Sequence, residues 1–600
     1  MACLTRDGSP LRGGGGPAHD RAVMHRGEWR GRRGVCALLG ALLFGMGACG
    51  GDDDGQDDGG SDDGTTSDAS LPDAGADAPD AGGDAPDAGG AIDSGVDGGS
   101  EGIAIEDVVT ADGDTQIRQG GAAELVITGR DLGDVDTVFV GDIDGTVLAA
   151  SPGEVRVDFF VPHGTAPGPR TVTVSGPGGS ASQADALELT FYIVAPDVAA
   201  GGRGTYQSPA TLCDLSTARP LLGDTVSLLA GEHVCDLEPG VPFVLSGGVT
   251  IEGEGSGVTV VRGGAASFPG FAIDSELVLP RGGFRGLTIE APDPVDGALF
   301  LSGTIGLAVD DLVIEGPGVV VDVGSFADLA VTGLRQLGPG IGIDGRGEID
   351  LTMSGSRFSD CEVGLLVRSG AADVTDTVFE RCELGVRGGF IADVFNEPLV
   401  RLTRCELLDD EVGLSVGLGS TIVTDSVFRD LEVTPQASRV GARVGYGFLT
   451  VVGGEVSGMD EVGILVEGSS TTEGFARAIV GGVTIVGGPV GIEVAGFPDD
   501  ELLILRDSVV REQTVASVRA VADGSGARID LGNGGEAGGN QLSVTSGVAI
   551  LDVRESPFPS DEVIDCTGIT LNGRTYTGLV EGPAQSLPDY QIVNGGMLQF

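Results

Sequence analysis

A short unit, an apolar residue followed by glycine, recurs at long and unequal intervals from residue 363 to residue 491. Its glycines are 21, 28, 28, 22 and 28 residues apart, as subtraction of successive residue numbers shows. A period in the twenties with variable insertions is typical of stacked coils, each of which buries its apolar face against the next. The six units are Val363-Gly364, Leu384-Gly385, Val412-Gly413, Val440-Gly441, Val462-Gly463 and Val490-Gly491.

Short strands lie upstream of these units. The segments VTDTVF at Val374 and VTDSVF at Val423 alternate apolar and polar residues and show no helical period, and related segments begin at Leu351 and Leu503. Two or three such strands per coil, joined by polar turns, predict a parallel β-helix with Val, Leu and Ile stacked inside and coils about 4.8 Å apart. Because an open end would be an aggregation edge, we expect caps at the ends.

The segment that begins at Gly201 fits such a cap. Pro209 to Leu222 can form one short amphipathic helix, and Gly223 to Gly231 is predicted to be turn, strand and turn. This segment resembles the N-terminal cap of right-handed parallel β-helix proteins, the pectin-lyase-like superfamily. Asp530 to Asn540 resembles the closing coil of a bacterial β-helix family of unknown function often found in lipoproteins. The expected divisions are a cap at 196–245, the β-helix at 246–578 and a tail at 579–600.

A different pattern precedes the cap. Between residues 102 and 195, short alternating strands separated by Gly and Pro turns predict a small β-sandwich. Gly121 to Gly129 (GAAELVITG) and Pro167 to Val174 (PGPRTVTV) resemble the IPT/TIG family of immunoglobulin-like domains. That resemblance implies a binding or spacing module. His163 follows a proline in a turn, so we expect it to face solvent.

The N-terminal segment has the layout of an export signal. A basic stretch that ends at Arg33 is followed by the apolar run VCALLGALLFGMGA and then by Cys49. Met46-Gly-Ala-Cys49 resembles the lipobox of bacterial lipoproteins, which implies a lipid on the Cys49 sulfur and anchoring to the bacterial membrane, at the outer membrane or cell surface. Ordinary cleavage after Ala48 is the alternative. Residues 1–48 are therefore the expected signal peptide, with Met24 as an alternative start.

The charge of the chain restricts its partners. Residues 49–101 form an acidic Asp, Gly, Ala and Pro tract with almost no large apolar residue, which predicts a disordered tether. The formal net charge is −56; without residues 1–48 it becomes −60, because 34−7=27 arginines and 90−3=87 acids remain. Such a field disfavours nucleic acid, since a phosphate-binding surface needs positive charge.

Alignment of the coils places charged residues in two columns. One column contains Asp376, Arg404 and Asp425. An ion pair between coils is one interpretation; the other makes Arg404 the base of a polysaccharide lyase beside acidic calcium ligands. The second column lies two residues before each glycine. Stacked carboxylates there would need calcium if buried, and no cation if they lie in exposed turns. This column contains Glu362, Glu383, Glu411 and Glu461, with Asp410 and Asp460 beside the last two.

The cysteines predict structural staples, because export permits disulfides. Cys213 and Cys235 occur in a repeated CDL and could staple the cap. Cys361 and Cys382 occupy equivalent places one coil apart, where either a disulfide or two stacked thiols would fit. Cys405 belongs to another column.

These features predict an all-β protein: a tether, an immunoglobulin-like sandwich and a right-handed parallel β-helix. The expected role is structural or adhesive, with a glycan or a surface protein bound along the β-helix. A polysaccharide lyase or glycoside hydrolase is the first alternative and a passive coat protein the second. Calcium is the one cofactor that the sequence suggests, and histidine metal clusters are excluded because only His163 and His233 follow Cys49.

Overall fold

The computed structural model describes residues 102–599 apart from gaps. The predicted signal peptide, Cys49, the predicted tether at 49–101 and Cys566 lie outside the described residues. Within the described part, no helix is long and apolar enough to span a membrane. The gaps are 237–241, 264–269, 276–281, 291–296, 304–305, 325, 390–396, 432–439, 468–475, 496–500, 522–527, 533–536, 553–563, 566–567, 576–578, 581–588 and 595–596.

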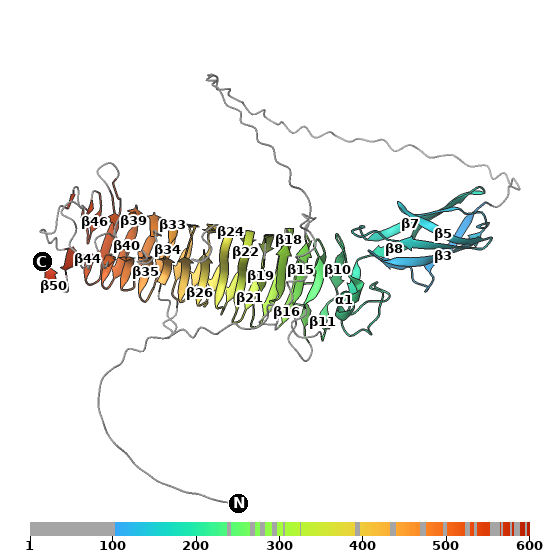
Figure 1. The fold of residues 1–600 in the computed structure, drawn as a ribbon, viewed down its shortest axis with the longest axis horizontal. Helices are drawn as coiled ribbons and strands as arrows, with labels where there is room; N and C mark the ends of the chain where they lie inside the picture. Colours follow the sequence, from blue (N-terminus) through green and yellow to red (C-terminus); the bar gives the residue numbers. More distant parts are fainter. Residues whose placement is uncertain are drawn as a thin grey trace, which may run out of the picture. The chain divides into compact units, whose positions relative to one another are not determined.

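The N-terminal domain is entirely β (Figure 1). Its strand order is β1-β3-β6-β5-β4-β7-β8-β2, antiparallel throughout except for the parallel pair β2 and β8. Alternate residues such as Leu125, Ile127 and Phe159 are buried in one core. The predicted all-β domain is confirmed, and its place in the IPT/TIG family stays a prediction. The strands are β1 Ala104–Thr110, β2 Gln116–Arg118, β3 Ala122–Arg130, β4 Thr137–Val140, β5 Ile143–Ser151, β6 Glu154–Phe160, β7 Gly168–Gly176 and β8 Gly179–Thr190.

The first rung of the β-helix lies earlier in the chain than the sequence predicts. Strand β9 (Tyr192–Val194) pairs in parallel with β10 (Thr225–Leu228), and Tyr192 and Val194 belong to the β-helix core. The predicted boundary between residues 195 and 196 is therefore wrong, because β9 precedes it and already belongs to the β-helix. In the sequence, β9 lies next to β8, and the long cap segment separates it from its partner strand β10.

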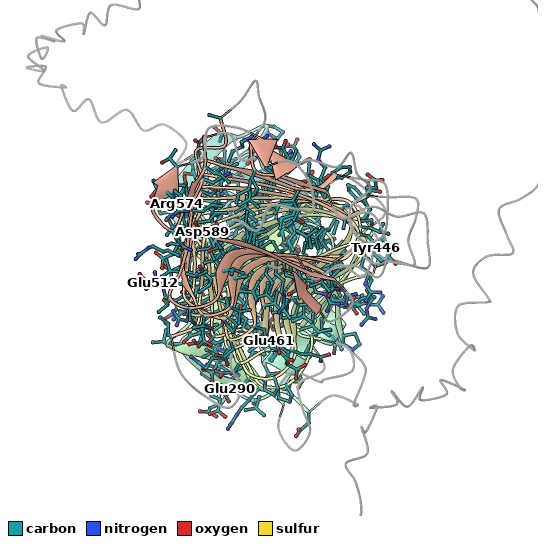
Figure 2. The ribbon with its side chains drawn as sticks, turned by 90° about the vertical axis from the view of Figure 1, so that its left-hand side faces the viewer. Glu290, Tyr446, Glu461, Glu512, Arg574 and Asp589 are labelled. Atoms are coloured by element: carbon teal, nitrogen blue, oxygen red, sulfur yellow. A yellow bond between two sulfur atoms is a disulfide. The ribbon has the colours of Figure 1, made fainter. Side chains whose placement is uncertain are left out.

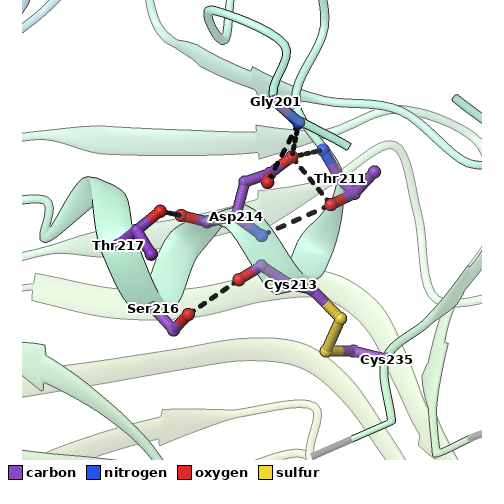
Figure 3. The surroundings of a disulfide bond; sticks show 7 residues. All are labelled: Gly201, Thr211, Cys213, Asp214, Ser216, Thr217 and Cys235. Carbon is purple, nitrogen blue, oxygen red and sulfur yellow. Dashed lines mark hydrogen bonds between the residues drawn. A yellow bond between two sulfur atoms is a disulfide. The ribbon is translucent and has the colours of Figure 1, made fainter. Parts of the chain in front are cut away.

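The cap helix is shorter than the predicted segment Pro209 to Leu222. It consists of the 3-10 turn η1 (Leu212–Asp214) and α1 (Leu215–Ala218). Thr211 and Asp214 form a capping box, in which Asp214 N donates to Thr211 Oγ1 and Thr211 N donates to the Asp214 carboxylate (Figure 3). The helix stops after one turn because the next residue has a φ of 45° and a proline follows it.

Two disulfides tie neighbouring segments together. Cys213, in the cap, is joined to Cys235, which follows β11 (Gly231–Val234) (Figure 3), and Cys361 is joined to Cys382 on adjacent coils. The Cα atoms of the second pair are 4.4 Å apart, close to the spacing of stacked coils. Cys405 is a buried free thiol, and burial raises its pKa to about 11, so it is not nucleophilic near neutral pH.

The rest of the described chain is a parallel β-helix with three strands per coil, so the predicted fold is confirmed by its strand ladder. Figure 1 shows the coils stacked side by side from β10 to β44. We call the three sides face A, face B and face C, in chain order within a coil. Strands β16 and β18 run through face A into face B, and β22 and β24 run through face C into face A of the next coil.

Face A begins with β9 and contains β10, β13 Thr250–Gly253, β16 Gly282–Glu290, β18 Gly306–Glu315, β20 Ala327–Thr332, β22 Ile341–Ser354, β24 Val363–Thr375, β27 Leu399–Thr403, β30 Ser420–Thr424, β33 Gly447–Val452, β36 Ala476–Gly481, β39 Glu501–Arg506 and β42 Arg528–Asp530. Face B has short strands: β11 Gly231–Val234, β14 Thr259–Arg262, β21 Arg335–Leu337, β23 Arg357–Ser359, β25 Val378–Glu380, β28 Glu406–Leu408, β31 Val427–Arg429, β34 Glu455–Ser457, β37 Thr484–Val486, β40 Val509–Gln513, β43 Gln541–Val544 and β46 Thr570–Leu571.

Face C contains β12 Phe243–Ser246, β15 Phe271–Ser275, β17 Leu299–Gly303, β19 Val321–Val323, β26 Leu384–Gly388, β29 Val412–Val416, β32 Val440–Val444, β35 Val462–Glu467, β38 Val490–Ala495, β41 Ala516–Val521, β44 Val548–Asp552 and β49 Tyr590–Asn594. Four further short strands lie near the C-terminal end: β45 Ile564–Asp565, β47 Arg574–Thr575, β48 Leu579–Val580 and β50 Met597–Gln599.

The glycines of the repeat stand on face C where the backbones of stacked coils approach each other closely. A Cβ built on Gly364 would lie 2.6 Å from the carbonyl oxygen of Gly385 and 2.3 Å from Cδ1 of Phe379. The same clash with the next glycine's carbonyl recurs, at 2.6 or 2.7 Å. The repeat therefore requires glycine because of close approach, and the pattern seen in the sequence has a packing cause. The other glycines in this position are Gly385, Gly413, Gly441 and Gly463.

Candidate functional site

The predicted column of Asp376, Arg404 and Asp425 lies in the turns between face A and face B. All three residues have left-handed backbones, with φ of 49°, 52° and 48°. Arg404 Nε and Nη2 each donate to a carboxylate oxygen of Asp376 at 2.7 Å, whereas Asp425 acts on Arg404 through its charge alone. Aspartate tolerates this backbone better than most residues, so turn geometry accounts for the acids in the column.

The chemistry of this pair opposes the predicted catalytic role of Arg404. The hydrogen bonds and charge of Asp376 raise the pKa of Arg404, while the same bonds lower the pKa of Asp376. A general base must be unprotonated so that it can accept a proton, and a raised pKa keeps the Arg404 guanidinium protonated. Both side chains are more than half exposed. The geometry is that of an ion pair between coils, as in the first interpretation of the column.

The predicted glutamate column lies in the turns that lead into face C, and its members are exposed. In the described part of the chain, no three His, Cys, Asp or Glu residues lie together in a way that could hold a metal ion. The calcium hypothesis thus finds no cluster of ligands there, and the exposed turns need no cation. The exposed members are Glu362, Glu383, Glu411 and Glu461, with Asp460 beside the last.

Asp410 differs from its neighbours in this column because it points inward. Its Oδ1 accepts a hydrogen bond from Cys382 N at 2.8 Å, while its Oδ2 has no hydrogen-bond partner among the described atoms. Burial raises the pKa of Asp410 well above its usual range. A carboxyl that resists ionisation inside a coil is a weak calcium ligand, because the ion requires the charged form.

The structure brings together a second charged group that the sequence columns do not reveal. Asp322 in β19 and Asp344 in β22 face each other at the same register on adjacent coils of face C. Their flanking residues Val321, Val323 and Ile343 point into the core, so alternation directs both carboxylates outward. Their side chains are nevertheless only 5% and 1% exposed. Two carboxylates are thus stacked and shielded from water.

Arginines from the same face hold this carboxylate pair. Arg346 Nε donates to Asp344 Oδ2 at 2.8 Å, and its Nη1 lies 3.4 Å from Asp322 Oδ2. Arg368, one coil further on, places Nη2 3.5 Å from Asp344 Oδ1. The carboxylates raise the pKa of Arg346, so its guanidinium is charged at any physiological pH. We call Asp322, Asp344, Arg346 and Arg368 the face C cluster.

Charged residues continue along face C beyond the cluster. In register with Asp344, Arg387 lies two coils further on and Arg443 four coils further on. Burial lowers the pKa of Arg387, and the like charges of Arg368 and Arg443 lower it further, which shows that these guanidiniums lie near one another. Arg443 also donates to Glu467 at 2.7 Å.

Figure 2 views the coils from one end and helps to locate this face. Glu461, in the turn before β35, and Tyr446, in the turn after β32, are labelled there and mark the two edges of face C. Glu512, on the side of face B, lies on the other side of the view. The strands of face C run between these two turns.

A signal for the cluster is present in the sequence. Asp322 and Asp344 each interrupt an apolar strand, in VVVDVG and IGIDGRG. An acid at the same position of two successive coils would have revealed the pair. The recurring apolar–Gly units begin at Val363, after both aspartates, so their spacing does not reveal this pair.

No protein-family model matches the chain, and no curated protein sequence matches it. Among solved structures, the A-module of mannuronan C-5 epimerase AlgE6 from Azotobacter vinelandii is 15% identical, with 53% of this chain and 90% of that chain covered at a TM-score of 0.35. The catalytic unit of a GH87 α-1,3-glucanase from Streptomyces thermodiastaticus is 14% identical, with 75% and 90% covered at a TM-score of 0.33. The periplasmic alginate epimerase AlgG is 11% identical, with 58% and 81% covered at 0.34. At such scores these similarities say nothing about the reaction.

Proposed function

We propose that this protein is exported, anchored by a lipid on Cys49, and binds an extracellular polysaccharide on face C of its β-helix. The export signal and the lipobox-like Met46-Gly-Ala-Cys49 support the anchor. The acidic tether that follows would hold the folded domains away from the membrane, because its aspartates repel one another. A surface protein could be the ligand instead, and the face C cluster favours the sugar polymer.

The observation that carries this proposal is the shielded carboxylate pair of Asp322 and Asp344 with its arginines. Carboxylates accept hydrogen bonds from adjacent sugar hydroxyls, and the planar guanidiniums of Arg346 and Arg368 donate to hydroxyl or carboxylate oxygens. Taking carboxylates out of water is costly, and exposed pairs such as Asp376 with Arg404 already bridge coils without that cost. A binding role explains why the costly arrangement is present.

The shape of face C suits an extended polymer. From Asp322 to Arg443 the column spans five coil steps, which is roughly 24 Å at 4.8 Å per step. Charged groups recur along this length at the same lateral position. A straight polymer lying along the column would meet several of them in turn, and each contact would add to the affinity.

Glycoside hydrolysis or polysaccharide cleavage by a lyase is a second candidate for the same site. It is favoured by the pairing of Asp322 and Asp344, because glycosidases use two carboxyl groups that flank the scissile bond. Both carboxylates contact the same guanidinium, that of Arg346, so the geometry does not assign one of them as the acid and the other as the nucleophile. Binding is therefore the primary proposal.

The test compares two charge-removing variants of the mature chain, Asp344→Asn in the face C cluster and Asp376→Asn in the exposed turn. We expect binding to a polysaccharide array to fall at least tenfold for Asp344→Asn and to stay unchanged for Asp376→Asn. Sugar product released by the parent and lost in Asp344→Asn would establish the enzymatic candidate. Absence of both binding and product, or equal binding by both variants, would overturn the proposal.

The anchor is tested separately. In the full-length chain, Cys49→Ser should move the protein from the membrane fraction to the soluble fraction and abolish incorporation of a labelled fatty acid. Retention of the label in Cys49→Ser would show that the lipid is attached elsewhere or that the segment is not a lipobox.

A further inference from the structure

The sandwich and the first coil are joined by a contact that lies outside face C. His163 Nδ1, in the sandwich, lies 2.6 Å from Oδ2 of Asp224, the residue before β10. Gly164 N donates to the other oxygen of Asp224 at 3.2 Å, and Asp224 is buried. The expectation that His163 faces solvent is thus wrong, because a buried carboxylate from the β-helix accepts its hydrogen bond.

A second side chain makes the reciprocal contact. Gln119, in the sandwich, is buried, and its Oε1 accepts a hydrogen bond from Thr225 N at 2.9 Å. Its Nε2 donates to Thr165 O at 2.5 Å, within the sandwich. Gln119 and Asp224 therefore each satisfy a backbone group of the other domain. Removal of either side chain while the contact stays closed would leave a buried backbone N–H of the other domain unpaired, which costs far more than losing a surface hydrogen bond.

The backbones at this contact also touch. Gly164 and Gly223 have φ of +73° and +86°, and a Cβ added to Gly223 would lie 3.0 Å from the Cα of Gly164. A side chain at either position would meet a disfavoured backbone conformation, and one at Gly223 would also press against the Gly164 backbone, whereas a Cβ on Gly164 would approach Gly223 no closer than 3.5 Å. The two loops are thus shaped to fit each other at close range.

We propose that the sandwich is a working part of the N-terminal cap of the β-helix, locked to the first coil by the clasp of Gln119, His163 and Asp224. An open first coil would expose unpaired strand edges. Strand β9 follows β8 of the sandwich after one residue and pairs with β10, so a sandwich that is held in place also holds the first rung. The complete cap then consists of the predicted segment at 196–245 together with the sandwich.

The test uses hydrogen exchange of the mature chain with the double variant Gln119→Ala/His163→Ala. We expect exchange in β10 to accelerate at least tenfold, while β29, far along the β-helix, and β3, in the sandwich core, exchange as in the parent. Unchanged exchange in β10 would overturn the proposal. Acceleration confined to β3 would also overturn it, because the clasp would then stabilise the sandwich alone.

A glycine pair gives a second and independent test. Gly223→Ala should accelerate exchange in β10 in the same way, because its Cβ meets the Gly164 backbone. Gly113→Ala is the matched control: its φ is +87°, and nothing lies within 4 Å of the added Cβ. If both substitutions accelerate exchange in β10 equally, backbone strain rather than the contact with Gly164 is responsible, and the clasp is contradicted.

Discussion

Two arginine–carboxylate ion pairs in this β-helix have similar N–O distances but different surroundings. Arg404 lies 2.7 Å from Asp376 in a turn, and Arg346 lies 2.8 Å from Asp344 on face C. The Asp376 side chain is 54% exposed and that of Asp344 is 1% exposed. The N–O distance therefore does not distinguish an ion pair that merely bridges two coils from one that belongs to a candidate site. The two pairs differ in the solvent exposure of the carboxylate.

The largest expected effect comes from breaking the buried member of this comparison. Asp344→Ala removes the carboxylate that both Arg346 and Arg368 contact, and we expect the free energy of unfolding to fall by about 2–4 kcal/mol. Urea unfolding measures this change. Asp376→Asn is the control, because Asn tolerates the left-handed backbone of this turn, and it should unfold with the parent's midpoint. Equal midpoints for Asp344→Ala and the parent would show that the burial of the cluster has no energetic consequence.

Asp410 extends the comparison to a buried carboxyl with no arginine bonded to it. Since its folded pKa is raised, the folded state keeps a proton that the unfolded chain releases near pH 4. Its contribution to stability is therefore full below pH 4 and is lost as pH rises toward the folded pKa, by about 1.4 kcal/mol for each unit of pKa shift.

Asp410→Asn removes this proton and tests the assignment. Subtracting the parent's unfolding free energy from that of the variant should give a difference that grows in favour of the variant between pH 4 and pH 8. Other ionisable groups cancel in the subtraction. A difference that does not change with pH would mean that Asp410 ionises normally in the folded protein.

A smaller effect should distinguish the two arginines. Arg346 bonds Asp344 through Nε and reaches Asp322 through Nη1, so its planar fork spans two coils. Arg346→Lys keeps the charge and cannot span both carboxylates, and we expect a loss of about 1 kcal/mol. Arg404→Lys at the exposed turn should have no measurable effect on the urea midpoint. If both lysine variants match the parent, the bridging geometry of Arg346 has no role.

Some parts of this structure could be predicted from local pattern and others could not. The spacing of the Val-Gly units predicts the coils, because the same close approach of backbones recurs at Gly364 and its equivalents. The rung at Tyr192 could not be predicted in the same way, because the cap segment, residues 195–224, separates β9 from its partner strand β10 in the sequence. Its short apolar strand reads equally well as the end of the sandwich.

The face C cluster needed three-dimensional information for a different reason. The positions of Asp322 and Asp344 in apolar strands can be read from the sequence, but their burial depends on the side chains of neighbouring coils. Outward positions of a β-helix strand are exposed by default, so pattern alone predicts a solvated acid. The candidate ladder at Asp376 was visible because left-handed turns favour aspartate, and that local rule says nothing of function.

The smallest expected effect tests whether the exposed column is set by backbone or by charge. Asp376→Asn removes the charge and keeps a residue that tolerates φ of 49°, so the melting temperature should not change in 0.15 M or 1 M salt. Asp376→Val removes the charge and adds a β-branched side chain in a left-handed turn, and we expect the melting temperature to fall by about 1–3 °C. Calorimetry resolves this difference. If Asp376→Asn lowers the melting temperature as much as Asp376→Val, the ion pair with Arg404 stabilises the coil after all. The exposed and buried pairs would then differ in degree only, and burial would no longer distinguish the candidate site from an ordinary ion pair between coils.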